Sequence, residues 1–293
     1  MSVPYLRALR GELTVVGKSP DGDSIRFIPD RADLLHDLYR GDRVRITRAD
    51  GSVQLRLEGI DAPETHYGGD AQPLGAEARD WLLEQAGFAD VVFDESATVQ
   101  SATPATRPAV ALSKGVDPNG RPIAYLLVDD GADLRDGAWT HVDRELLDRT
   151  LNARSLTAGV SYLTLSTSTP APHRTRLRRL AADAREAGKG VWAADESEMF
   201  RLHSQASISP PNGVLILPKL FRRCTDYLKA RDNGFAGTLP DWLVAVSATG
   251  TRPEDDLVLI GGRTEVRLSA IVKQLNERVS FGADLLDVVF VEK

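Results

Sequence analysis

Apolar and polar residues alternate near residue 55, where Leu55 and Leu57 are interleaved with Arg56 and Glu58. A period of two is typical of a strand with one buried face and one accessible face. Pro63 follows within a few residues and favours a turn, because proline cannot donate to a strand ladder. We therefore predict a half-buried strand that carries Arg56 toward a turn rich in carboxylates.

The rest of the first two hundred residues contains further strand patterns, amphipathic helical patterns and two insertions. Strands are predicted at 11–18, 23–28, 44–47, 89–93, 110–112 and 123–128. The spacing of leucine and alanine predicts helices at 74–87, 144–156 and 174–188. The insertions are 31–50, with helical character, and 96–116, which begins with a loop at 96–108 that is rich in Ser, Thr, Pro and Ala.

A second unit is predicted after the sequence S-I-S-P-P-N-G, which has the composition of a linker within residues 196–213. Beyond it the pattern predicts a helix at 218–230, strands at 242–246, 257–260, 265–268 and 286–291, and a short helix near 269–275. We therefore expect two domains, residues 1–200 and a smaller α+β domain at 201–293.

Composition narrows the class of protein. The chain has 293 residues, 42% of them hydrophobic and 27% charged, which is ordinary for a globular protein. The single cysteine, Cys224, excludes an intrachain disulfide and a cysteine-based zinc site. The sequence contains no run of about 18 apolar residues, so no membrane span is predicted. The first residues lack the pattern of a signal peptide. A cytoplasmic location and no membrane partner are expected.

The net charge of −6 is unevenly distributed. Residues 201–293 hold 12 Lys and Arg against 11 Asp and Glu, whereas residues 1–200 hold 24 against 31. The predicted helix at 218–230 and the residues just after it concentrate the positive charge at Lys219, Arg222, Arg223, Lys229 and Arg231. This helix is expected to turn a basic face outward, either as a solvated surface or as a contact for a partner or nucleic acid.

Three motifs carry the chemistry: D-G-D-S at 21–24, R-L-E-G-I-D-A-P-E-T at 56–65 and G-R-P-I-A-Y at 120–125. Two arginines and several carboxylates suit a site that holds a hard cation and attacks a phosphodiester. Taken singly, each residue is better explained by solvent exposure or turn chemistry. Their joint occurrence, in this order and spacing, resembles the staphylococcal-nuclease (thermonuclease) family over residues 9–195.

The resemblance implies an α+β fold: a five-stranded Greek-key β-barrel of the OB type with three flanking helices, a surface suited to single-stranded nucleic acid. It also implies a calcium site, with Asp23 and Asp61 as carboxylate ligands and the carbonyl of Ala62 as a further ligand. Calcium accepts six to eight oxygen ligands in flexible geometry, so waters would complete such a set.

The resemblance assigns the remaining site residues as well. Glu64 would be the general base, Arg56 and Arg121 would bind the scissile phosphate, and Tyr162 would contact the substrate. The guanidinium fork can meet two phosphate oxygens at once, which an ammonium cannot.

The function implied is that of a calcium-dependent nuclease, an endonuclease acting on DNA, RNA or both, with a preference for single strands and 3′-phosphate products. The alternative is a catalytically silent module of the same family that binds nucleic acid or protein. The presence of all five charged site residues favours the enzyme.

Overall fold

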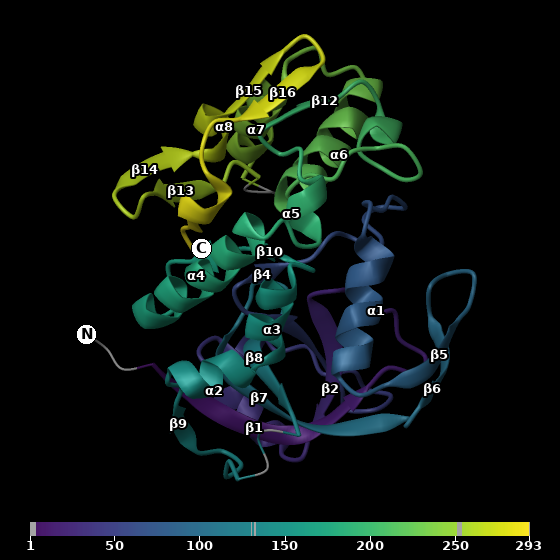
Figure 1. Ribbon diagram of the computed structural model, residues 1–293, viewed down its shortest axis with the longest axis vertical. Helices are drawn as coiled ribbons and strands as arrows, with labels where there is room; N and C mark the ends of the chain where they lie inside the picture. The colour runs from purple at the N-terminus through teal and green to yellow at the C-terminus, as the bar shows by residue number, and fades with distance from the viewer. Residues whose placement is uncertain (1–3, 130, 132, 251–253, 293) are drawn as a thin grey trace.

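The computed structural model describes residues 4–129, 131, 133–250 and 254–292. Five strands close into a barrel: β1 (Tyr5–Thr14), β2 (Ser24–Pro29), β3 (Val53–Leu57), β8 (Pro122–Val128) and β7 (Thr106–Val116). They are hydrogen-bonded in that order, and β7 returns to β1. Among the pairs of barrel strands, β3–β8 is parallel and the others are antiparallel. The predicted barrel is confirmed, and it occupies the lower part of Figure 1.

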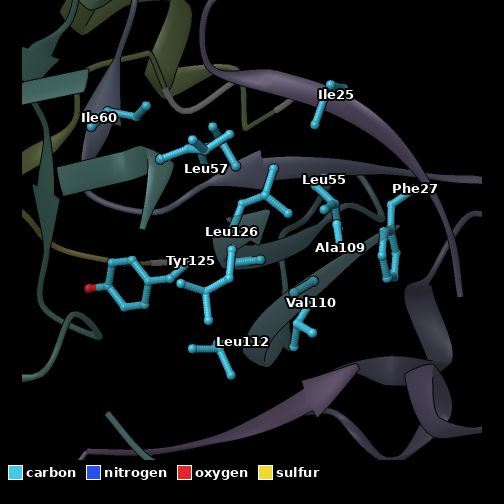
Figure 2. Packing of buried hydrophobic residues seen from close by; sticks show 14 of the residues in the cluster. Ile25, Phe27, Leu55, Leu57, Ile60, Ala109, Val110, Leu112, Tyr125 and Leu126 are labelled. Atoms are coloured by element: carbon cyan, nitrogen blue, oxygen red, sulfur yellow. The ribbon is translucent and has the colours of Figure 1, made fainter. Parts of the chain in front are cut away.

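The barrel interior is filled by the apolar face of each strand. In β3 the residues at alternate positions, Val53, Leu55 and Leu57, are buried, whereas Gln54 and Arg56 are only half-buried. Figure 2 shows Leu55, Leu57 and residues of the other barrel strands converging on one core. The predicted alternation of buried and accessible residues is confirmed in β3, and it places the side chain of Arg56 outside the barrel core.

Helices pack around the barrel and begin close to where the sequence predicts them. They are α1 (Gly75–Gln85), α2 (Arg144–Arg149), α3 (Leu151–Ala158), α4 (Ala171–Glu186) and α5 (Val191–Ala194). The helix predicted at 144–156 is divided at Thr150, whose extended backbone ends α2. The Thr150 hydroxyl then accepts a hydrogen bond from the Ala153 amide and caps α3.

Asn152 joins helix α3 to the barrel. Its side-chain oxygen accepts a hydrogen bond from the Leu126 amide at 2.9 Å, and its amide donates to the carbonyls of Glu58 and Ala124. Asn152 is fully buried. A buried amide with three partners orients the helix against β8, because any other orientation would leave buried polar groups without a hydrogen bond and without water.

Replacing Asn152 with alanine is expected to lower the free energy of unfolding by about 2 kcal/mol or more, because three hydrogen bonds to backbone groups are lost and the buried Leu126 amide is left unpaired. Urea denaturation followed by circular dichroism measures this change. Asn119→Ala is the matched control, since the Asn119 side chain is exposed. Equal midpoints for the two variants would contradict the role assigned to Asn152.

Short strands complete the first part of the chain and correct two predictions. β4 (Ile60–Asp61) pairs with β10 (Tyr162–Leu163), and β9 (Trp139–His141) extends the barrel sheet beside β1. The predicted loop at 96–108 is wrong, because it contains β6 (Val99–Thr103), which pairs with β5 (Ala89–Phe93), and the start of β7. The predicted strand at 44–47 is wrong too: the 31–50 insertion forms 3-10 turns at Ala32–Asp37 and Gly41–Arg43 and otherwise lacks regular structure.

The C-terminal part is α+β, as predicted. Its helices are α6 (Pro218–Asp232), α7 (Leu239–Ala248) and α8 (Leu268–Ile271), and its strands are β12 (Met199–Arg201), β13 (Leu257–Ile260), β14 (Thr264–Arg267), β15 (Val272–Leu275), β16 (Arg278–Phe281) and β17 (Val288–Phe290). The short helix predicted near 269–275 is only partly right, because β15 occupies its second half. Short 3-10 turns lie at Gln205–Ser207 and Leu285–Asp287.

The strand predicted at 242–246 is wrong, since these residues lie within α7. Thr238 and Asp241 form a reciprocal capping box at its start. Leu239, Trp242 and Leu243 are the buried positions, which is the i, i+3, i+4 spacing of a helix. A run of apolar residues this short does not distinguish a helix from a strand.

Residues 196–213 do not form an isolated linker. Strand β12 pairs with β16, and Leu202 and Ile208 are buried in the C-terminal core. The two parts also share a small sheet, in which β11 (Leu165–Ser166) pairs in parallel with β17. Figure 1 shows the C-terminal elements above the barrel, with α4, α5, β4 and β10 between them. The boundary near residue 200 stays a prediction.

Helices long and apolar enough to cross a membrane are absent from the described part of the chain.

Candidate active site

The D-G-D turn is packed against the loop that follows β4. Asp21 Oδ1 accepts hydrogen bonds from the Gly22 amide at 2.9 Å and from the Thr65 amide at 3.3 Å. A Cβ atom on Gly22 would lie 2.6 Å from Cβ of Ala62, so only glycine allows this approach. The contact brings Asp23 close to the carboxylates of the 61–65 loop.

Asp61 and Glu64 are held at defined positions in that loop. Asp61 lies in β4, opposite Tyr162 of β10, and its side chain is 1% exposed. The Glu64 amide donates to Gln72 Oε1, and the Gln72 amide donates to the Glu64 carbonyl. Gln72 Nε2 in turn donates to the carbonyl of Ile216 at 2.7 Å. One buried glutamine thus links the Glu64 loop to the C-terminal part.

Arg222 of α6 enters the same site. Its guanidinium donates to Asp61 Oδ2 at 3.0 Å and to Asp61 Oδ1 at 3.1 and 3.2 Å, and it forms a second ion pair with Glu64 Oε1. Arg222 and Asp61 are 161 residues apart in sequence. The predicted metal ligand and the predicted general base are therefore bridged by one cation of the chain itself.

The site concentrates negative charge away from water. Burial and, to a smaller extent, the negative charges of Asp21 and Asp61 raise the pKa of Asp23 to about 7. Burial also raises the pKa of Glu64 to about 8, against the attraction of Arg222. Burial opposes ionisation of Asp61 too, but the charges of Arg222 and Arg56 outweigh it and hold the pKa of Asp61 below its usual value.

Arg56 lies at the edge of a pocket of ≈ 330 Å³ between the barrel and the C-terminal part, which Lys219 and Arg223 also line. Its charge acts on both Asp23 and Asp61. Within the described residues the Arg56 side chain forms no hydrogen bond and no ion pair. A guanidinium without a protein partner, beside buried carboxylates, is available to an anionic ligand.

Arg121 is engaged elsewhere. Its Nε donates to Asp117 Oδ2 at 2.8 Å, and its backbone amide donates to Asp117 Oδ1 at 2.9 Å. No hydrogen bond or ion pair joins Arg121 to the Asp61 loop in the part of the chain that the structure describes. The structure thus brings Asp23, Arg56, Asp61 and Glu64 together and holds Arg121 in a separate pair, so its role at the phosphate stays a prediction.

Tyr162 is buried rather than exposed to a ligand. Its hydroxyl donates to Asp195 Oδ1 at 2.9 Å, and its ring lies edge-on to Trp192 with centroids 5.3 Å apart. It packs in the same core as residues of α6. In this arrangement the ring supports β10 opposite Asp61, and contact with a substrate stays a prediction.

The outward basic face predicted for α6 is wrong for Lys219, Arg222 and Arg223, which are turned inward, whereas Lys229 is exposed. Its five cationic side chains are all directed to partners within the chain: Lys219 to Asp256, Arg222 to Asp61 and Glu64, Arg223 to Glu254 and Asp256, Lys229 to Gly68 and Asp70, and Arg231 to the carbonyl of His203. Their positive charge offsets carboxylates of both parts of the chain, so little of it is available to attract a polyanion.

The residues fit a calcium ion only in part. Asp23, Asp61 and the Ala62 carbonyl are oxygen donors of the kind that calcium prefers. Both carboxylate oxygens of Asp61 are occupied by Arg222, however. The described residues contain no group of three or more His, Cys, Asp or Glu side chains that could hold a metal. The predicted set of two carboxylates and a carbonyl is smaller than such a group and stays a prediction.

Comparison with known proteins agrees with the fold. Residues 54–194 match the family described as "Staphylococcal nuclease homologue". Proteins named "Probable endonuclease LCL3" from Clavispora lusitaniae and Meyerozyma guilliermondii are each 38% identical to this chain, over 85 and 80 residues. The corresponding protein of Aspergillus niger is 37% identical over 82 residues.

The matches to these relatives cover 28%, 26% and 26% of this chain, and 35%, 34% and 29% of the relatives. The chain therefore spans about a third of the length of the curated relatives that it matches. Together with the closed barrel, these findings show that residues 54–194 are similar to staphylococcal nuclease, and they confirm the predicted resemblance.

Three site residues escaped the sequence reasoning. Asp21 stood within the D-G-D motif, and its spacing from Asp23 was a usable signal. Gln72 and Arg222 had none, because a glutamine in a loop and an arginine on a charged helix are both ordinary surface residues. The packing of α6 on the loop positions Arg222, and hydrogen bonds to Glu64 and Ile216 position Gln72.

Proposed function

We propose that this chain is a nuclease that hydrolyses phosphodiester bonds in DNA or RNA. One observation carries the proposal: Arg56, without a partner among the described residues, lies beside the buried carboxylates Asp23, Asp61 and Glu64 on a staphylococcal-nuclease-like barrel. The names of the relatives support the same class of reaction.

The roles follow from the chemistry of each group. Arg56 would bind two oxygens of the scissile phosphate and stabilise the charge that develops there, and Arg121 would assist once released from Asp117. Glu64 would accept the proton of the attacking water, for which a pKa near neutrality is suited. We propose calcium as the cofactor, held by Asp23, Asp61 and the Ala62 carbonyl after Arg222 has left, where it would neutralise phosphate charge.

We propose endonucleolytic action on single strands with 3′-phosphate products, on the basis of the family resemblance. The second candidate is a catalytically silent binding module. One observation favours it, namely the ion pairs by which Arg222 occupies Asp61 and Glu64. The nuclease should hydrolyse nucleic acid under some condition, whereas the silent binding module should not do so under any condition.

The test is to incubate the full chain with labelled single- and double-stranded DNA and RNA, in calcium or in excess EGTA. We expect cleavage in calcium that falls to background in EGTA, because the cation offsets charge that repels the phosphate. We also expect single strands to be cleaved faster than double strands. End-labelling of the products identifies the 3′-phosphate. Undiminished cleavage in EGTA would contradict the calcium proposal, and no cleavage of any substrate would favour the silent module.

A further inference from the structure

We propose that Arg222 is an intramolecular competitor for the cation, so that the C-terminal part keeps the nuclease site closed until α6 withdraws from it. This inference rests on the proposed function, since it concerns the regulation of the same site.

The first step is the geometry of the contact. The guanidinium reaches both oxygens of Asp61, at 3.0 to 3.2 Å, and also pairs with Glu64. The three side chains are 20%, 1% and 11% exposed for Arg222, Asp61 and Glu64 respectively. A bidentate pair in such a dry place is directional, and it satisfies the oxygen atoms that a cation would need.

The second step is the balance of charge. The carboxylates of Asp23, Asp61 and Glu64 repel one another, and Arg222 is the largest positive charge acting on both Asp61 and Glu64, with smaller contributions from Arg56 and Lys219 at Asp61. Removing Arg222 takes away the largest positive charge on Asp61 and Glu64 and frees the Asp61 oxygen atoms that the proposed calcium site needs. The guanidinium of Arg222 therefore occupies, as a fixed monovalent cation, the place that the proposed exchangeable calcium ion would take.

The third step is the docking of α6, which holds Arg222 in place. Tyr67 Oη donates to Asp226 Oδ2 at 2.7 Å, and Lys229 Nζ donates to the Gly68 carbonyl at 3.3 Å. Tyr67 and Gly68 belong to the loop that begins at Glu64. The same short loop thus carries the proposed base and binds the helix that covers it, so moving α6 frees both carboxylates in one step.

The consequence is a measurable reduction in the affinity for calcium. When only a fraction of molecules has the site open, the apparent dissociation constant rises in inverse proportion to that fraction. The Arg222→Ala variant removes the competitor and leaves every proposed calcium ligand in place. We expect it to bind calcium at least about tenfold more tightly than the unmodified chain.

The experiment is calorimetric titration of calcium alone into the full chain after EGTA treatment, for the unmodified protein, Arg222→Ala and Arg231→Ala. Arg231 lies on the same helix and contacts the His203 carbonyl, away from the carboxylates, so its variant should match the unmodified protein. A calcium affinity in Arg222→Ala equal to or weaker than that of the Arg231→Ala control would overturn the inference.

A second variant keeps the test decisive if Arg222→Ala does not fold. Tyr67→Phe removes the hydrogen bond to Asp226 but leaves Arg222 and all carboxylates in place. It should loosen the docking of α6 and tighten calcium binding by about two- to fivefold, a smaller change of the same sign. An unchanged affinity in folded Tyr67→Phe, measured where Arg222→Ala cannot be, would likewise overturn the inference.

Cleavage by the same proteins separates this inference from the proposed function. Tighter calcium binding in Arg222→Ala with no hydrolysis supports the competitor and contradicts the nuclease. Hydrolysis by the unmodified chain, with equal calcium affinity in both proteins, supports the nuclease and overturns the competitor. Tighter binding together with faster cleavage at limiting calcium supports both.

Discussion

Replacing Asp23 with asparagine is expected to abolish cleavage and, at the same time, to stabilise the folded protein. The carboxylate of Asp23 is a proposed calcium ligand, so its loss should lower the cleavage rate by about two orders of magnitude or more. Ionised Asp23 is also repelled by Asp21 and Asp61 in a buried place. Asparagine keeps the shape of the side chain and removes this repulsion.

The stabilisation has a defined dependence on pH. Because the folded-state pKa of Asp23 is raised to about 7 from an ordinary value of 3.8, the ionised carboxylate costs stability as pH rises through that window. Asp23→Asn should therefore match the unmodified protein below about pH 4 and gain steadily up to about pH 7. The gain above pH 7 should be on the order of 1–2 kcal/mol, since the repulsion is shared with neighbouring acids.

Thermal or urea unfolding in EGTA across this pH range measures the effect without bound cation. Asp42→Asn, which changes an exposed carboxylate, is the control and should show no such trend. A variant that is less stable than the unmodified protein at pH 8, or one that cleaves at the full rate, would contradict the placement of Asp23 among the site carboxylates.

Replacing Arg56 with lysine is expected to lower the cleavage rate by about a hundredfold or more while leaving thermal stability nearly unchanged. Arg56 forms no hydrogen bond or ion pair within the described residues, so its guanidinium has little structural role to lose. Lysine keeps the positive charge but cannot meet two phosphate oxygens with a planar fork. The loss therefore reports geometry at the phosphate rather than net charge.

Single-turnover cleavage at saturating calcium, together with thermal unfolding, measures both quantities. Arg48→Lys is the matched control, because Arg48 is exposed and the same chemical change there should be neutral. If Arg56→Lys keeps more than about half of the rate, the stabilisation of the transition state assigned to Arg56 is wrong.

The barrel and the grouping of Asp23, Arg56, Asp61 and Glu64 were predictable because both depend on short stretches of sequence, whereas the separate positions of Arg121 and Tyr162 were not. The alternation of Leu55 and Leu57 with polar residues specifies which face is buried, and a shift by one residue would expose the apolar set. The D-G-D turn and the 56–65 motif each place their charged residues within a few positions. Closure of the barrel then brings Asp23 beside Asp61.

Other features depended on packing that no local pattern reveals. The residues around Trp242 read equally well as strand or helix until the cap at Thr238 and the surrounding core selected the helix. Thr150 divides the 144–156 helix through its own backbone and hydroxyl. At Trp242 burial in the surrounding core adds to the local cap and outweighs an intrinsic preference of only a few tenths of a kcal/mol per residue, whereas the division at Thr150 is made by a local hydrogen bond to Ala153.

The sequence by itself determined the barrel, the cluster of carboxylates and the presence of Arg56 beside them. The tertiary structure alone decided whether that cluster is open. Arg222 lies 161 residues from Asp61 and belongs to a helix whose charges read as a free basic surface. Long-range ion pairs leave no periodic trace in a sequence, because they require two elements to dock with matched charges, and docking is decided by the apolar surfaces beneath them.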